Sequence, residues 1–110
     1  MDEKTAVAAL AALAPSMRLR VFRALVGAAL QGMTPGLLAS TLGLPASTLS
    51  FHLKALMHAG LVSQQRDGRS LVYRPDIARM NQLLAYLTAH CCQGAACDVQ
   101  PAAACSTPTC

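Results

Sequence analysis

The sequence predicts a mainly α-helical domain of about five helices that carries one small β-hairpin. Three observations predict it. Apolar residues recur at helical spacing over most of the chain, and a very short helix is joined to a longer one by a tight turn. Near 62–74 this spacing gives way to the alternation of apolar and polar residues that is typical of strands. With 110 residues and four aromatic side chains the core is small, so a dimer interface would add to its stability.

Two helices are expected in the first third of the chain. The first spans about 3–14 and ends at Pro15, and the second spans about 17–30 and ends at Gly32. Each has apolar residues at three- and four-residue spacing. The apolar stripe of the first helix comprises Val7, Leu10, Leu13 and Ala14, and that of the second comprises Leu19, Phe22, Val26, Ala29 and Leu30. Three arginines lie off the second stripe: Arg18, Arg20 and Arg23.

The next two helices form a short helix–turn–helix pair. Thr34 followed by Pro35 is a strong helix start, because the hydroxyl caps free amides and proline suits the first helical position. We expect a helix over 35–42, a tight turn at "GLP", and a second helix over 46–58 that stops at Gly60.

A β-hairpin follows the helix pair. Strands are expected at 62–66 and 70–74, and Pro75 ends the second one. Asp67-Gly68 is the predicted two-residue turn, because the turn that matches strand twist needs positive φ at both positions.

The last predicted helix spans 76–90. Its apolar face comprises Ile77, Met80, Leu83, Leu84 and Leu87. No periodicity follows, so we expect a domain of residues 1–92 and a flexible tail of residues 93–110 that contains cysteine. A hairpin placed between a helix–turn–helix pair and a closing helix is the layout of a winged helix-turn-helix domain.

Basic residues are confined to the first part of the chain. Residues 1–79 hold nine Lys and Arg against four Asp and Glu, a net charge of +5, whereas residues 80–110 hold only Asp98. This balance favours a polyanionic partner such as nucleic acid, with ordinary solubility charge as the alternative.

No stretch approaches the ~18 apolar residues of a membrane span. The apolar run at 5–14 follows two acidic residues where a signal peptide has a positive flank, so we expect a cytoplasmic protein.

The exposed face of the 46–58 helix carries candidate DNA-binding residues. If Leu49 points inward, a rotation of about 100° per residue places Leu53 and Leu56 beside it. The opposite face and its flank carry Ser47, Ser50, Phe51 and Lys54. Hydroxyls bond phosphates or base edges, lysine meets phosphate or guanine, and a phenyl ring touches a thymine methyl. An exposed ring also suits a protein interface. His52 falls near the inward side, where we expect it to pack.

Two arginines flank the predicted hairpin tip. Arg66 and Arg69 should lie close across the ribbon, where like charges destabilise a hairpin. A phosphate between them would relieve this repulsion, and Asp67 relieves part of it. We therefore add Arg66 and Arg69 to the candidate DNA-binding residues.

Three runs of sequence resemble the ArsR/SmtB family of bacterial metal- and metalloid-responsive repressors: "LAPSMRLRVFRALV", "LASTLGLPASTLSFHLKALMHAGLV" and "QRDGRSLVYR". The resemblance implies a homodimer joined through the first and last helices. It also implies that the protein binds double-stranded operator DNA and represses transcription. This repression is relieved when a metal, metalloid or oxidant binds. The 35–42 helix has no cysteine, so the arsenic site that some members carry there is missing. The last helix lacks an alternating Asp/His set, so zinc sensing through paired helices is not expected.

Three cysteines follow the last predicted helix: Cys91, Cys92 and Cys97. Adjacent Cα atoms lie ~3.8 Å apart, below the roughly 4.4–6.8 Å of a disulfide, so we interpret Cys91 and Cys92 as thiolate ligands. Three thiolates suit trivalent arsenic, whereas His90 as a fourth ligand would suit zinc. Within the family, a Cys-Cys pair and a third Cys after the last helix resemble the arsenite-responsive subgroup with a C-terminal metal site.

The sequence thus predicts a transcriptional repressor that leaves its operator when these thiolates bind As(III) as arsenite or a methylated form, or bind antimonite. The alternatives are a redox-sensing repressor, a sensor of another thiophilic metal, and a cysteine cluster without a role. Cys105 and Cys110 are either spare ligands or incidental. The chain has no nucleophile–base pair and no phosphate loop, so we expect no enzyme activity and no catalytic cofactor.

Overall fold

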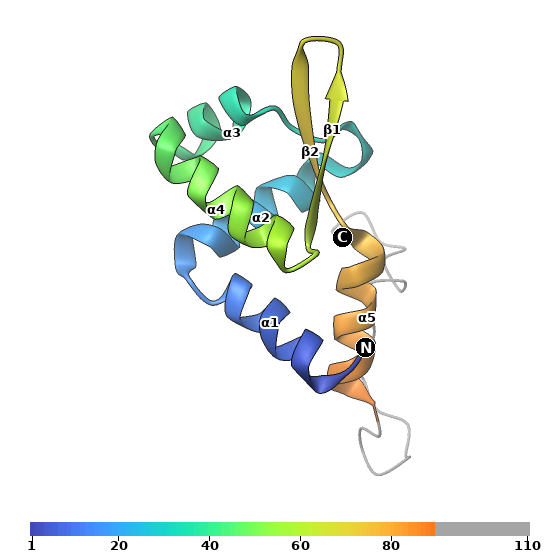
Figure 1. Cartoon of the computed structure of the whole chain (residues 1–110). Coiled ribbons are helices and arrows are strands. Elements are labelled where there is room, and N and C mark those ends of the chain that lie inside the picture. The colour runs from blue at the N-terminus through green and yellow to red at the C-terminus, as the bar shows by residue number, and fades with distance from the viewer. Residues whose placement is uncertain (90–110) are drawn as a thin grey trace.

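Five α-helices, one 3-10 helix and a two-stranded antiparallel sheet make up residues 1–89, the part of the chain that this computed structural model describes (Figure 1). In chain order the elements are α1 (Glu3–Leu13), α2 (Ser16–Ala28), η1 (Ala29–Gln31), α3 (Pro35–Leu42), α4 (Ala46–His58), β1 (Val62–Asp67), β2 (Ser70–Pro75) and α5 (Ile77–Thr88). This is the predicted winged helix-turn-helix order.

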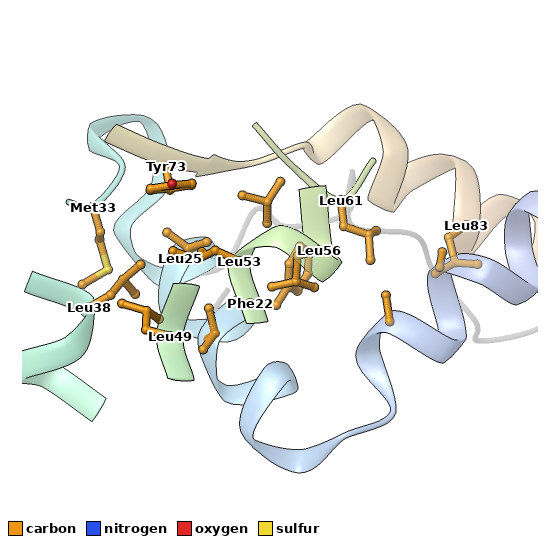
Figure 2. Close-up of a cluster of buried hydrophobic side chains, with 14 of the residues drawn as sticks. Phe22, Leu25, Met33, Leu38, Leu49, Leu53, Leu56, Leu61, Tyr73 and Leu83 are labelled. Carbon is orange, nitrogen blue, oxygen red and sulfur yellow. The ribbon is translucent and has the colours of Figure 1, made fainter. Parts of the chain in front are cut away.

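The core lies where α2 and α4 pack against each other and against the hairpin, with α1 and α3 at its ends (Figure 2). Its centre consists of fully buried side chains: Val21, Leu25, Leu38, Leu49, Leu53, Leu56 and Leu61. Leu49, Leu53 and Leu56 recur at helical spacing on α4, and burying each such side chain contributes about 1.5–3 kcal/mol. Their burial fixes the rotation of α4 and turns its opposite face toward solvent.

Local caps set the ends of the helix–turn–helix pair. The Thr34 hydroxyl oxygen accepts the Leu37 N–H at 3.2 Å, and Pro35 occupies the first turn of α3. Gly43 ends α3 in the left-handed region, with φ 66°. Pro45 precedes α4 with extended backbone and supplies no side-chain cap. The predicted bounds of both helices are confirmed.

The hairpin turn differs from the predicted one. Asp67 pairs with Ser70, so the two turn residues are Gly68 and Arg69 rather than Asp67 and Gly68. Gly68 has φ 63°, which places glycine at the first turn position, where both primed hairpin turns need positive φ. Arg66 consequently pairs with Leu71, and the prediction that Arg66 and Arg69 face each other across the ribbon is wrong.

The base of the hairpin is joined to the segment that precedes α3. Met33 and Tyr73 exchange two backbone hydrogen bonds, at 2.9 and 2.8 Å. Gly32, with φ 68°, makes this approach possible, because a Cβ there would lie 2.6 Å from Val72 Cγ1 and 2.7 Å from the Tyr73 carbonyl oxygen. Arg74 adds a side-chain link, since its guanidinium donates to the Leu30 carbonyl and to Gln65 Oε1, both at 2.9 Å.

On three helices the predicted apolar stripe differs, wholly or in part, from the face that is buried. On α2 the buried residues are Val21, Phe22 and Leu25, whereas the predicted stripe, apart from Phe22, is largely exposed, at Leu19 and Val26 on α2 and at Leu30 on η1. On α1 the buried residues are Ala6, Ala9 and Ala12, and Val7 and Leu10 are exposed. On α5 only Leu83 is buried, while Ile77 and Leu87 are exposed.

Within residues 1–89, no single helix combines the length and apolar character that a membrane span needs. The α1–α2 pair reaches them only when both helices are taken together, and the two are bent by 98° relative to each other.

Candidate nucleic-acid interface

The solvent face of α4 carries the four helix residues predicted to contact DNA. Ser47, Ser50, Phe51 and Lys54 are all exposed, and Phe51 exposes 65% of its surface. Leu49, Leu53 and Leu56, on the opposite face of α4, pack into the core (Figure 2). The resulting surface has small hydroxyl side chains in its first turns, then a phenyl ring and a cation. Small residues let a helix approach base edges closely, and the other groups match what the major groove offers.

Phe51 has two neighbours within the chain. The Arg18 guanidinium lies 5.7 Å from the centre of the Phe51 ring, in cation–π range. The His52 ring meets it edge to face, with 5.7 Å between centroids and 67° between ring planes. These contacts leave most of the ring open to solvent while restricting where it points.

Arg18 and His52 also bond to each other. Arg18 Nε donates to His52 Nδ1 at 3.4 Å, which joins α2 to α4. Burial, and secondarily the Arg18 charge, lower the pKa of His52 below its ordinary value of 6.5. The neutral imidazole is the form that accepts this hydrogen bond. The expectation that His52 packs against the protein is confirmed, since it is half-buried.

Arg18 is the residue near this face that sequence reasoning missed. Helical spacing places it with Arg20 and Arg23, off the predicted apolar stripe of α2. Its spacing of three and seven residues from Val21 and Leu25 was the available signal, because residues so spaced share one side of a helix. Arg18 is accordingly half-buried, whereas Arg20 and Arg23 are exposed.

The hairpin carries the other two predicted DNA-binding residues. Arg66 lies on β1 and Arg69 in the turn, and both are exposed. The hairpin extends away from the helices beyond its anchored base (Figure 1). Its distal part therefore presents two cations free of the core. Their assignment to DNA remains a prediction.

The predicted arsenic ligands lie outside the described residues. Cys91, Cys92 and Cys97, with His90, follow the last described position, and all five cysteines of the chain lie beyond residue 89. Within residues 1–89 no three His, Cys, Asp or Glu side chains are grouped to hold a metal ion. The C-terminal site stays a prediction from the sequence.

The fold and the exposed α4 surface together define a winged helix-turn-helix DNA-binding protein. A family model described as a helix-turn-helix domain matches residues 13–65. HlyU from Vibrio cholerae is 31% identical, with a TM-score of 0.60 over 79% of this chain and 97% of that one. A structure described as reduced HlyU from the same organism is 28% identical, with a TM-score of 0.62 over 82% and 92%.

Two further solved structures are similar to this chain. An ArsR-like transcriptional regulator from Rhodococcus sp. RHA1 is 26% identical, with a TM-score of 0.69 over 76% of each chain. A homodimeric DNA-binding domain from Mycobacterium bovis, described as a possible ArsR-family regulator, is 28% identical, with a TM-score of 0.61 over 79% and 81%. No curated protein sequence matches. The chain belongs to the same family of winged-helix proteins as HlyU, and its solved neighbours include ArsR-like transcriptional regulators.

Proposed function

We propose that this regulator is an arsenic-responsive repressor that binds operator DNA as a homodimer and leaves it when trivalent arsenic binds Cys91, Cys92 and Cys97. The observation that carries the DNA-binding half is the exposed surface of α4, with Phe51 and Lys54 held outward by three buried leucines. The observation behind the arsenic half is the placement of two adjacent cysteines within four residues of the end of α5.

Exposed apolar side chains on α1 and α5 support the dimer. Val7 and Leu10 on α1 expose 57% and 43% of their surface, and Ile77 and Leu87 on α5 expose 44% and 52%. A small domain gains stability by covering such side chains with a second copy. The Mycobacterium bovis relative is described as homodimeric, which favours the same assembly here.

The position of α5 supports a mechanical link between inducer and DNA. One end of α5 follows β2 directly, and the other end leads to the cysteines. In the proposed dimer, arsenic binding restrains that second end and changes the spacing of the two α4 helices. Inducer binding and DNA binding then weaken each other by the same coupling free energy, typically about 1–3 kcal/mol.

Cysteine variants test this assignment. Cys91→Ser and Cys92→Ser should bind the upstream DNA of the gene as the wild type does, yet stay bound when arsenite is added. Cys105→Ser and Cys110→Ser are matched controls, and we expect both to be released normally. Normal release of Cys91→Ser and Cys92→Ser would contradict the assignment of the arsenic ligands.

A redox-sensing repressor is the second candidate, favoured by the relative solved as reduced HlyU. Two cysteine thiolates brought together by oxidation would restrain the same end of α5. Peroxide would then release the DNA with no arsenic present, and dithiothreitol would restore binding. Release by arsenite under strictly reducing conditions separates the proposed function from this candidate.

A further inference from the structure

A basic groove runs between α1 and α4 and ends near the first turn of α5. It consists of two adjoining hollows of about 660 and 310 Å³. Both are lined by Ala8, His58 and Ala59, so they form one continuous depression. Small alanine side chains of α1 and α4 form much of its floor.

Five basic side chains border this groove: Arg18 and Lys54 in the larger hollow, Lys4 and Arg79 in the smaller one, and His58 in both. Among residues 1–89, no acidic side chain lines either hollow. The Arg79 guanidinium lies over Gly60, where an added Cβ would be 3.2 Å from its Nε and Nη2 atoms. This places a cation beside the C-terminal end of α4, which a helix dipole favours.

The shape and charge of the groove favour a long polyanion over a small ligand. Small-molecule sites enclose about 70–90% of their ligand, which an open depression does not do. The basic side chains are instead spread along the groove from four helices, α1, α2, α4 and α5. Lys54 and Phe51 belong to both the groove and the exposed face of α4, so the groove continues the candidate DNA-binding surface.

The groove and the proposed dimer contacts use different edges of α1. At about 100° per residue, Ala8 and Ala11 flank the buried alanine face on one side, and Val7 and Leu10 flank it on the other. A second copy centred on Leu10 would leave the groove edge at Ala8 uncovered, whereas Val7 lies only about 40° from Ala11.

We propose that the basic groove binds the sugar–phosphate backbone of the DNA beside the segment that α4 reads, with Lys4 and Arg79 as phosphate contacts. This inference rests on the proposed DNA binding and adds two contact residues to it. Phosphate contacts position a protein without reading sequence and release counterions, so their loss lowers the salt dependence of binding.

The test compares two double variants that lose the same charge. Lys4→Gln with Arg79→Gln removes the groove contacts. Arg20→Gln with Arg23→Gln removes two exposed cations from the side of α2 that faces away from Arg18. Fluorescence anisotropy measures the affinity of each for operator and for a scrambled duplex over a range of salt concentrations, and circular dichroism verifies folding.

We expect the groove variant to lose at least about tenfold in affinity for both duplexes and to lower the slope of log K against log[salt] by about 2, at ~0.9 per contact. The Arg20/Arg23 control should keep the wild-type slope. Equal slopes for the two variants, with wild-type DNA binding intact, would overturn this inference alone. Absence of DNA binding by the wild type would overturn the proposed function as well. A monomeric groove variant in ultracentrifugation would assign the groove to a subunit contact and overturn the inference.

Discussion

Arg18 on α2 and His52 on α4 are 34 residues apart in the chain, yet Arg18 Nε donates a hydrogen bond to His52 Nδ1 at 3.4 Å. The same guanidinium lies 5.7 Å from the centre of the Phe51 ring. One scaffold side chain therefore contacts two consecutive residues of the helix that presents the candidate DNA-binding surface. We infer that Arg18 positions Phe51 for DNA contact without contributing sequence information itself.

Replacing Arg18 by lysine separates positioning from charge. Arg18→Lys keeps the positive charge but loses the planar Nε donor, so the bond to His52 is lost. We expect operator affinity to fall about 2–12-fold, the effect of one hydrogen bond, with affinity for a scrambled duplex and the salt slope unchanged. Arg20→Lys is the matched control and should change neither affinity. Unchanged affinity for both duplexes would show that Arg18 acts through its charge alone, and an equal loss on both would show that it does not position Phe51 for the operator.

His52 makes stability depend on pH. Burial, then the Arg18 charge, lower its folded-state pKa below 6.5, so the unfolded chain takes up a proton on this residue first as the pH falls. The contribution of neutral His52 is fully present above pH 6.5 and is lost as the pH falls toward the folded-state pKa. Urea unfolding between pH 7.5 and 5 should show a smaller loss of stability for His52→Gln than for the wild type. His58→Gln leaves this pair intact and should retain the wild-type loss.

Phe51 and Leu49 lie on opposite faces of α4. Substitution of Phe51 should mainly lower operator affinity, whereas substitution of Leu49 should mainly lower the free energy of unfolding. Phe51→Ala removes a ring that is 65% exposed, so we expect the free energy of unfolding to change by under about 1 kcal/mol while operator affinity falls severalfold. Leu49→Ala empties a site in the core and should cost about 2–5 kcal/mol. Chemical denaturation and anisotropy measure the two effects. Unchanged operator affinity for a folded Phe51→Ala protein would remove Phe51 from the DNA-binding surface.

Gly32 and Gly27 test how the hairpin is anchored. Gly32→Ala places a Cβ 2.6 Å from Val72 Cγ1 at a φ of 68°, so we expect destabilisation of more than about 2 kcal/mol. Gly27 lies within α2, and nothing lies within 4 Å of an added Cβ there. Gly27→Ala should therefore stabilise the protein by about 0.5–1 kcal/mol. Thermal unfolding of both variants measures these opposite signs.

The sequence predicted the elements well where local chemistry determines them. The capping hydroxyl of Thr34 and the proline that follows it start α3 irrespective of the rest of the fold, and Gly43 ends it. The spacing of Leu49, Leu53 and Leu56 likewise determines which side of α4 faces outward, so all four predicted helix residues are exposed as expected.

Predictions that depended on tertiary contacts were less successful. α2 carries two adjacent apolar stripes, and its own residues do not determine which one packs against α4; the structure buries Val21 and Leu25 and leaves Leu19 exposed. The hairpin turn was misplaced by one residue, because Asp67-Gly68 and Gly68-Arg69 both place a glycine where positive φ is needed. The Arg18–His52 bond links positions too far apart in sequence for periodicity to relate them.

The most direct test of the proposed arsenic response is the affinity of the fully reduced protein for its own upstream DNA, measured by anisotropy with and without arsenite. Saturating arsenite should raise the dissociation constant by about 5–150-fold, and the same factor should separate the arsenite affinities measured in the presence and absence of DNA. An identical dissociation constant under both conditions, with all thiols titratable, would contradict the proposed arsenic response.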